Sequence, residues 1–181
     1  MKNHFLTIWY ITGAICLFSC TNNQEKPVFH KPYTGPLGVV NNVNTVYTEK
    51  AEILIKMKAK KQIEFQNGNR EFPEGIEIVF FEAGKPSSRM TANQAYFNRE
   101  KNTYKGVGNV VVKSLTNDDK LNSEELNWNP KTKKVTTDKF VRIENKDEIL
   151  TGDGLEADQD FRHYKFKNPK GIINKKYANG F

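Results

Sequence analysis

Short alternations of apolar and polar residues recur along the chain from residue 43 onward. In EILIKMKAK (residues 52–60), isoleucine and methionine fall on one face of an extended chain and lysines fall on the other. The segments GIEIVFFE, TYKGVGNVVVKS and KFVRIEN alternate in a similar way. A period of two residues is typical of β-strands with one buried face, and no long segment has the period of 3.6 residues that predicts a helix. The pattern therefore predicts an all-β protein.

Clusters of turn-forming residues separate the alternating segments. Asn67-Gly68, Asn129-Pro130 and Asn168-Pro169 are three such clusters, and Asn, Asp and Gly recur between the other segments. These residue types favour tight turns because their backbone or side chains adopt turn geometry at little cost. Strands joined by tight turns at short intervals predict an antiparallel sandwich, jellyroll or barrel.

The alternating segments also repeat one another. MTANQAYFN (residues 90–98) aligns with LNSEELNWN (121–129) and with LTGDGLEAD (150–158), and YKGVGNVVVKS aligns with VTTDKFVRIEN. Each repeat then consists of two strands, and one such unit cannot bury its own apolar face. We expect the units to stack so that their apolar faces form one continuous interior.

Residues 1–19 have the pattern of a lipoprotein signal peptide. Lys2 precedes the apolar run FLTIWYITGAICLF, which is shorter than the ~20 residues that a membrane span needs. The sequence Leu17-Phe18-Ser19-Cys20 resembles the bacterial lipobox, so Cys20 is the expected lipidation site. An uncleaved signal anchor is the alternative. Either interpretation tethers the chain to a membrane and places the remainder outside the cytoplasm.

The rest of the chain divides into three parts. Residues 20–42 contain several prolines among polar residues and are expected to form a flexible, lipid-anchored tether. Residues 43–174 contain the repeats and form the predicted β-domain. Residues 175–181 form a basic C-terminal tail.

The formal net charge of +7 suits an anionic partner, such as nucleic acid, a phospholipid surface or a phosphorylated glycolipid. The export signal disfavours nucleic acid, so no nucleic-acid partner is expected. Lysines crowd the segment KFKNPKGIINKKYANGF. We interpret them as protection of an edge strand against aggregation, with contact to lipid phosphates as the alternative.

The sequence offers little for catalysis. After signal cleavage only His30 and His163 remain as histidines, and neither lies in a motif with a serine or cysteine nucleophile. The acidic stretch GDGLEADQD lacks the order of a calcium loop, and strand alternation would scatter its carboxylates. We therefore expect no catalytic residue, no metal and no cofactor.

An apolar stripe remains as the candidate functional feature. Most such positions fill a β-core, but a sheet stack left open along one side would form a lipid-binding groove. Each CH₂ group removed from water contributes about 0.8 kcal/mol, so an exposed twelve-carbon chain costs on the order of 10 kcal/mol. The candidate groove residues are Phe97, Tyr104, Val110, Val112, Leu126, Trp128, Val135, Val141, Ile143, Leu155 and Phe166.

Several stretches together resemble the LptC family, the membrane-anchored periplasmic component of the lipopolysaccharide export machinery, and the related organic-solvent-tolerance repeats. The most specific are GNVVV (residues 108–112), SEELNW (123–128), TDKFVRI (137–143) and TGDGLEAD (151–158). The resemblance implies an antiparallel β-jellyroll, open at both ends, on the periplasmic side of the inner membrane of a Gram-negative bacterium.

The resemblance also implies a function and partners. The chain would accept lipopolysaccharide from an inner-membrane ABC transporter complex and pass it to a periplasmic bridge protein of the same fold, without hydrolysing anything itself. Its end strands would pair with these neighbours by β-augmentation. The strand near residues 43–47 would face the extractor, and strands within 155–173 would face the bridge. Gly152 and Gly154 match the family's glycine motif and would form a turn or bulge at that partner edge.

Two other functions stay open on the sequence. A cell-envelope lipoprotein that binds glycan or serves as a structural β-repeat module would have a filled core, with Trp128 and Tyr104 outside on a flat face. A solenoid polysaccharide hydrolase or lyase would need a convergent pair of carboxylates or a lysine pair, and no such pair stands out in the sequence.

Overall fold

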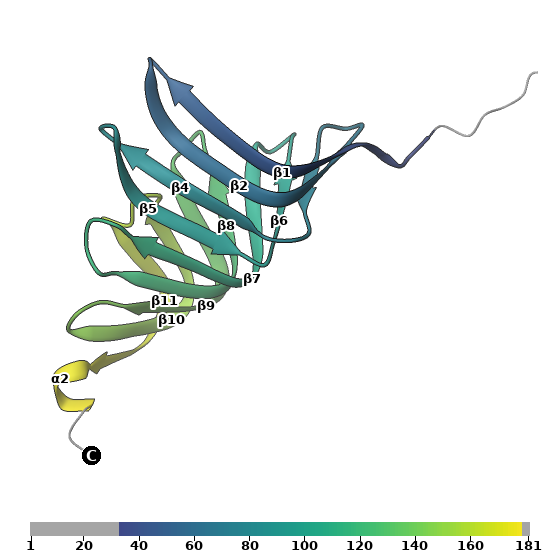
Figure 1. Ribbon diagram of the computed structural model, residues 1–181. Coiled ribbons are helices and arrows are strands. Elements are labelled where there is room, and N and C mark those ends of the chain that lie inside the picture. Colours follow the sequence, from purple (N-terminus) through teal and green to yellow (C-terminus); the bar gives the residue numbers. More distant parts are fainter. Residues whose placement is uncertain (1–32, 179–181) are drawn as a thin grey trace, which may run out of the picture. The chain divides into compact units, whose positions relative to one another are not determined.

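The computed structural model describes residues 33–178, and almost all of them lie in β-strands (Figure 1). The strands stack one after another, from the first strand at one end of the sheet to the last strand and a single helical turn at the other. The elements are β1 (Pro36–Glu49), β2 (Glu52–Phe65), β3 (Arg70–Phe72), β4 (Ile76–Glu82), β5 (Lys85–Ala92), β6 (Gln94–Asn98), β7 (Thr103–Ser114), β8 (Lys120–Asn129), β9 (Lys134–Glu144), β10 (Glu148–Asp158), β11 (Tyr164–Asn174) and α2 (Lys175–Ala178).

All the strands belong to one antiparallel sheet. Its main path runs β11-β10-β9-β8-β7-β5-β4-β2, and β1 pairs with β2 at the far end. The short strands β3 and β6 pair with each other, and they also join β2 to β7. Strands β2, β4, β5, β7, β6 and β3 therefore close into a ring. The predicted all-β, antiparallel architecture is confirmed, and it is consistent with a β-jellyroll.

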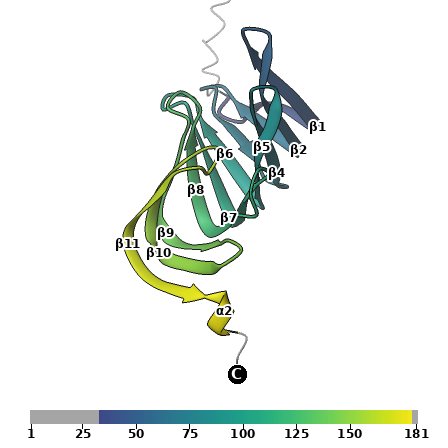
Figure 2. The same ribbon diagram turned by 90° about the vertical axis from the view of Figure 1, so that its left-hand side faces the viewer.

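The long strands bend, so that each contributes to two layers. In β7, residues 111–114 pair with β5 in the first layer and residues 103–107 pair with β6 in the second. The bend lies at Gly108 and Asn109, where φ is 75° and 46° and the register with β8 shifts. A positive φ suits glycine and asparagine, and a bulge of this kind bends a strand. We call the layer with β4 and β5 layer A and the layer with β3 and β6 layer B; Figure 2 shows the curvature of β8 to β11.

The sequence repeat corresponds to positions that line up across layer A. The aligned residues Met90, Leu121 and Leu150 belong to one row of directly paired residues that crosses the sheet. We call it the central row, and its members are Met57, Ile78, Met90, Val112, Leu121, Ile143, Leu150 and Ile172. The stacking of two-strand units is therefore confirmed from β5 onward.

The structure corrects the predicted boundary between tether and domain. β1 begins at Pro36 and pairs with β2, for example through Val39 and Ile63, so residues 36–42 belong to the sheet. Their prolines and glycines suggested a tether, but Pro is tolerated at the start of an edge strand and Gly38 lies at a register shift. Likewise, the predicted turn at Asn168-Pro169 lies inside β11, which is also an edge strand.

The predicted signal peptide and Cys20 lie outside the described residues. Within residues 33–178, no helix is long and apolar enough to cross a membrane. The single helical turn, α2, follows β11 directly and falls in the segment predicted as the basic tail.

Candidate functional site

The structure brings the predicted groove residues together in the interior between the two layers. Tyr104 and Phe166 are half-buried and pack against the others. The remaining side chains are at most 5% exposed, namely Phe97, Val110, Val112, Leu126, Trp128, Val135, Val141, Ile143 and Leu155. The interior is thus filled by side chains in this structure, which is the packing expected of a β-core.

An aromatic cluster joins the two layers. Phe80 of layer A contacts Trp128 of layer B edge-to-face, with ring centroids 5.0 Å apart. Trp128 stacks on Tyr104 at 5.1 Å, and Tyr104 lies 4.7 Å from Phe97. Contacts of this kind contribute about 0.5–1.5 kcal/mol each beyond the area they bury. Trp128 therefore lies inside the fold, whereas the glycan-binding alternative places it outside. The filled core, in contrast, agrees with that alternative.

One polar group lies at the edge of this cluster. The Arg70 guanidinium packs over the Phe97 ring at 4.3 Å and donates a 3.4 Å hydrogen bond to the Tyr104 hydroxyl. Burial raises the pKa of the Tyr104 hydroxyl, and Arg70 opposes that rise. A neutral hydroxyl at the boundary of an apolar interior keeps its hydrogen bond without placing a charge there.

The loop between β10 and β11 reaches from layer B to layer A. The Gln159 carbonyl accepts a 2.6 Å hydrogen bond from the Ser88 hydroxyl on β5, and its side-chain oxygen accepts one of 3.2 Å from the Trp128 indole. Phe161 is 3% exposed and belongs to the core. Arg162 pairs with Glu82 at the end of β4. None of these loop residues was predicted from the sequence to contact the interior.

A shallow, open depression lies near the N-terminal end of the sheet, beside β1, β2 and β4. Its apolar lining includes Val43, Ala59, Ile76 and Ala92, which pair in that order across β1, β2, β4 and β5. Sequence reasoning did not select these residues. A signal was present, because Ala92 aligns with Ser123 and Gly152 in the repeat and all are small.

Both end strands of the sheet have an unpaired edge among the described residues. β1 pairs only with β2, and β11 pairs only with β10. Nearly every residue of β1 is exposed, including Val46 and Tyr47, and β11 exposes Ile172 and Ile173. An exposed edge with apolar side chains is a template for pairing with another strand.

Gly152 and Gly154 form bulges within β10 and not a turn. A Cβ at Gly152 would lie 2.6 Å from the Phe166 ring and 2.7 Å from the Asn168 carbonyl oxygen, so only glycine lets β11 approach. Gly154 has φ of 71° and lies where the register with β9 shifts. Both residues therefore shape the pairing of the terminal strands, although β11 and not β10 is the edge strand.

Charged residues of this region are mostly paired. Lys170 contacts Asp153 at 2.6 Å, and Lys134 contacts Asp158 at 2.8 Å. Lys175 donates to Glu144 at 2.8 Å, and together with Arg142 it lowers the Glu144 pKa to about 2. Within the part of the chain that the structure describes, no group of three or more His, Cys, Asp or Glu residues could hold a metal ion.

The fold and interior define a class of protein: a bent antiparallel sheet with an apolar interior, whose two end strands each pair with only one other strand among the described residues. The family described as "Lipopolysaccharide-assembly, LptC-related" matches residues 6–171, and the chain belongs to this family. Membership makes it a periplasm-facing, inner-membrane-associated component of lipopolysaccharide transport, in a family whose role in that transport is not enzymatic. A search of curated proteins finds no match.

Proposed function

We propose that this chain is a lipopolysaccharide conduit that shelters acyl chains between layers A and B. The central row carries the proposal, because it crosses the sheet from β2 to β11 without a charged residue. With neighbouring strands about 4.8 Å apart, a row over eight strands spans roughly 34 Å. Such a row offers continuous apolar contact along the direction in which the lipid would move.

The free strand edges support a place in a chain of similar sheets. We propose that β1 pairs with the inner-membrane ABC extractor and that β11 pairs with the periplasmic bridge protein. Each edge would gain backbone hydrogen bonds by β-augmentation, and the two interiors would become continuous. Gly152 and Gly154 contribute by letting β11 lie close to β10.

We further propose that residues 1–19 are removed, that Cys20 is lipidated and that the segment up to β1 is the tether. Metabolic labelling with a palmitate analogue tests this directly. Label is expected on the full chain and absent from Cys20→Ala. Label that persists in Cys20→Ala would exclude Cys20 as the lipidation site.

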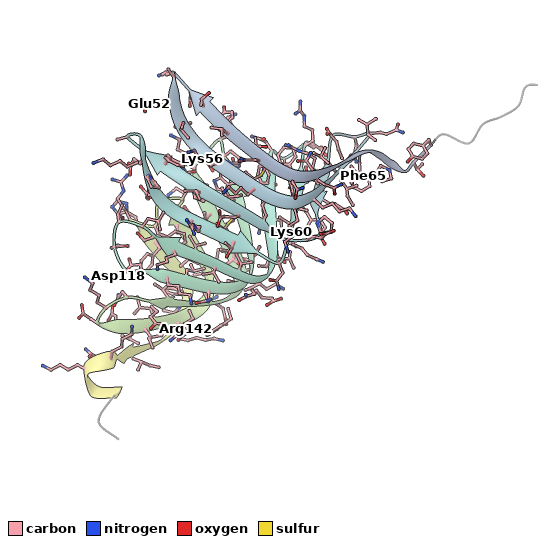
Figure 3. The ribbon with its side chains drawn as sticks, viewed as in Figure 1. Glu52, Lys56, Lys60, Phe65, Asp118 and Arg142 are labelled. Atoms are coloured by element: carbon pink, nitrogen blue, oxygen red, sulfur yellow. The ribbon has the colours of Figure 1, made fainter. Side chains whose placement is uncertain are left out.

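In-cell photo-crosslinking tests the conduit. A photoreactive side chain is best placed at the half-buried positions Ile55, Tyr104 and Leu150, because a bulky group at a fully buried site would overpack the core. Lys113 and Arg142 are the outward controls. The side chains of Lys56 and Lys60 on β2 and Arg142 on β9 mark the outer face in Figure 3.

We expect lipopolysaccharide adducts at the three inward positions and none at the controls. Adducts that are equal at both sets would mean non-specific contact. Absence of glycolipid adducts at every inward site, in cells that make the lipid, would leave the interior as ordinary core. The filled interior would then favour the structural or glycan-binding module.

A further inference from the structure

Residues 159–163 cross the mouth between the two layers, and we call them the latch. The Gln159 backbone carbonyl accepts a hydrogen bond from Ser88 in layer A, and the Gln159 side chain accepts one from Trp128 in layer B. The Arg162 side chain pairs with Glu82 in layer A. Their backbone is tied mainly to layer B, where Gln159 donates to the Lys133 carbonyl at 3.0 Å and His163 accepts from Asp158 at 3.0 Å. The latch is therefore anchored to one layer and fastened to the other by a few contacts.

Phe161 sits in the latch in an unfavourable backbone conformation. Its φ is 61°, in the left-handed region that bulky side chains rarely adopt and that costs of order 1 kcal/mol or more. The residue is nevertheless only 3% exposed and belongs to the buried hydrophobic core. Burial of the ring compensates for the strain of the backbone. If another apolar group fills the space of the ring, Phe161 can leave the core and its backbone strain is relieved.

The fastening to layer A can open without breaking the sheet. It consists of the Ser88–Gln159 hydrogen bond and the Arg162–Glu82 ion pair, and Arg162 is exposed. Arg162 is also oriented by Asp160, whose carboxylate lies 2.5 Å from the Arg162 Nε atom. None of these contacts belongs to the pairing of β10 with β9 or β11.

We propose that the latch closes the interior when lipid is absent and that the Phe161 ring occupies a site for one acyl chain of the glycolipid. Binding then displaces Phe161 outward, breaks the Trp128–Gln159 bond and leaves the strand pairing in place. This inference rests on the proposed function, since it identifies where and how the conduit admits an acyl chain.

The test compares latch variants with matched controls in the full-length chain, held in nanodiscs. Trp9 lies in the proposed signal peptide, so Trp9→Phe in every protein leaves Trp128 as the only tryptophan whether or not residues 1–19 are removed. Binding of fluorescently labelled lipopolysaccharide is followed by anisotropy, and Trp128 emission reports the position of the latch.

Phe161→Ala removes the ring that fills the proposed acyl-chain site, and Phe140→Ala removes a half-exposed phenylalanine on β9 as its control. Arg162→Ala releases the ion pair to Glu82, and Lys146→Ala removes the same charge from another exposed ion pair.

Phe161→Ala is expected to bind lipopolysaccharide on the order of tenfold more tightly, which corresponds to a latch open about a tenth of the time in the parent. Arg162→Ala is expected to gain a few-fold relative to Lys146→Ala, which shares its loss of positive charge. Phe140→Ala should match the parent. Lipopolysaccharide should shift Trp128 emission in the parent.

Other outcomes separate the two proposals. In one outcome, the parent binds lipopolysaccharide, but each latch variant binds it no more tightly than its control. Phe161 is then an ordinary core residue, and the latch proposal is wrong while the conduit proposal stands. Because Arg162 is exposed, its variant decides the matter even if Phe161→Ala does not fold. If the parent and all variants fail to bind, the conduit and the latch fall together.

Discussion

The two halves of the sheet close their interiors by different means. In the ring of β2 to β7, the short strands β3 and β6 connect layer B to layer A through backbone pairing. In the half formed by β8 to β11, the strands bend from one layer to the other and the mouth is fastened by the latch. Backbone ladders open only with the fold, whereas a few side-chain contacts open locally. In the account proposed above, the interior therefore admits a ligand through the C-terminal half.

The two halves differ at one place in two aligned repeats, the segment that contains β5 and β6 and the segment that forms β8. Asn93 interrupts the strand path between β5 and β6, and its N–H donates to the Gly108 carbonyl at 2.9 Å. The aligned segment of β8 passes the same place without a break, and the Ser123 hydroxyl donates to the Phe140 carbonyl at 2.9 Å. The broken path sends β6 into the ring, and the unbroken path keeps β8 as one bent strand.

The largest effect is expected from the ring core. Phe72 on β3 is fully buried, so Phe72→Ala should lower the free energy of unfolding by about 3–5 kcal/mol. Phe140→Ala, at a half-exposed position, should change it by less than about 1 kcal/mol. Urea unfolding followed by circular dichroism measures both. Equal, small effects would mean that β3 is not part of the cooperative core.

A smaller effect is expected where β10 meets β11. Gly152→Val would place methyl groups against Phe166 and the backbone at Asn168, and should cost about 1–3 kcal/mol. Gly171→Ala is the matched control, because its Cβ would meet only the Thr151 hydroxyl at 3.4 Å. A Gly152→Val protein as stable as Gly171→Ala would contradict the close approach of β11.

The smallest effect concerns the link between α2 and β9. The Glu144 pKa falls from 4.5 to about 2, chiefly through Lys175 and then Arg142. Because the folded pKa is the lower one, the stabilisation is present above about pH 4.5 and is lost as the pH falls toward 2. Glu144→Gln should reduce the pH dependence of urea unfolding between these values. Glu100→Gln, in an exposed turn, is the control, and an unchanged profile in Glu144→Gln would contradict the assignment.

The strands and the repeat could be predicted from the sequence, whereas the start of β1 and the burial of Phe161 could not. Alternation locates the strands because one face is buried, and the repeat places Met90, Leu121 and Leu150 in one row. β1 gives a weaker signal, since all of its residues except Val43 are exposed, and the sequence did not predict that it begins at Pro36. The burial of Phe161 is also hidden, because DQDFRHY reads as a polar turn and its contacts come from distant strands.

Hydrogen–deuterium exchange on the full-length chain, with and without lipopolysaccharide, tests the central claim most directly. Peptides that cover residues 158–163 should lose protection when the lipid binds, because the latch leaves layer A. Peptides that cover the ring strands β3 and β4 should keep their protection, because their backbone pairing is unchanged. Loss of protection in the ring, or a gain of protection in the latch, would contradict an interior that opens at its C-terminal half.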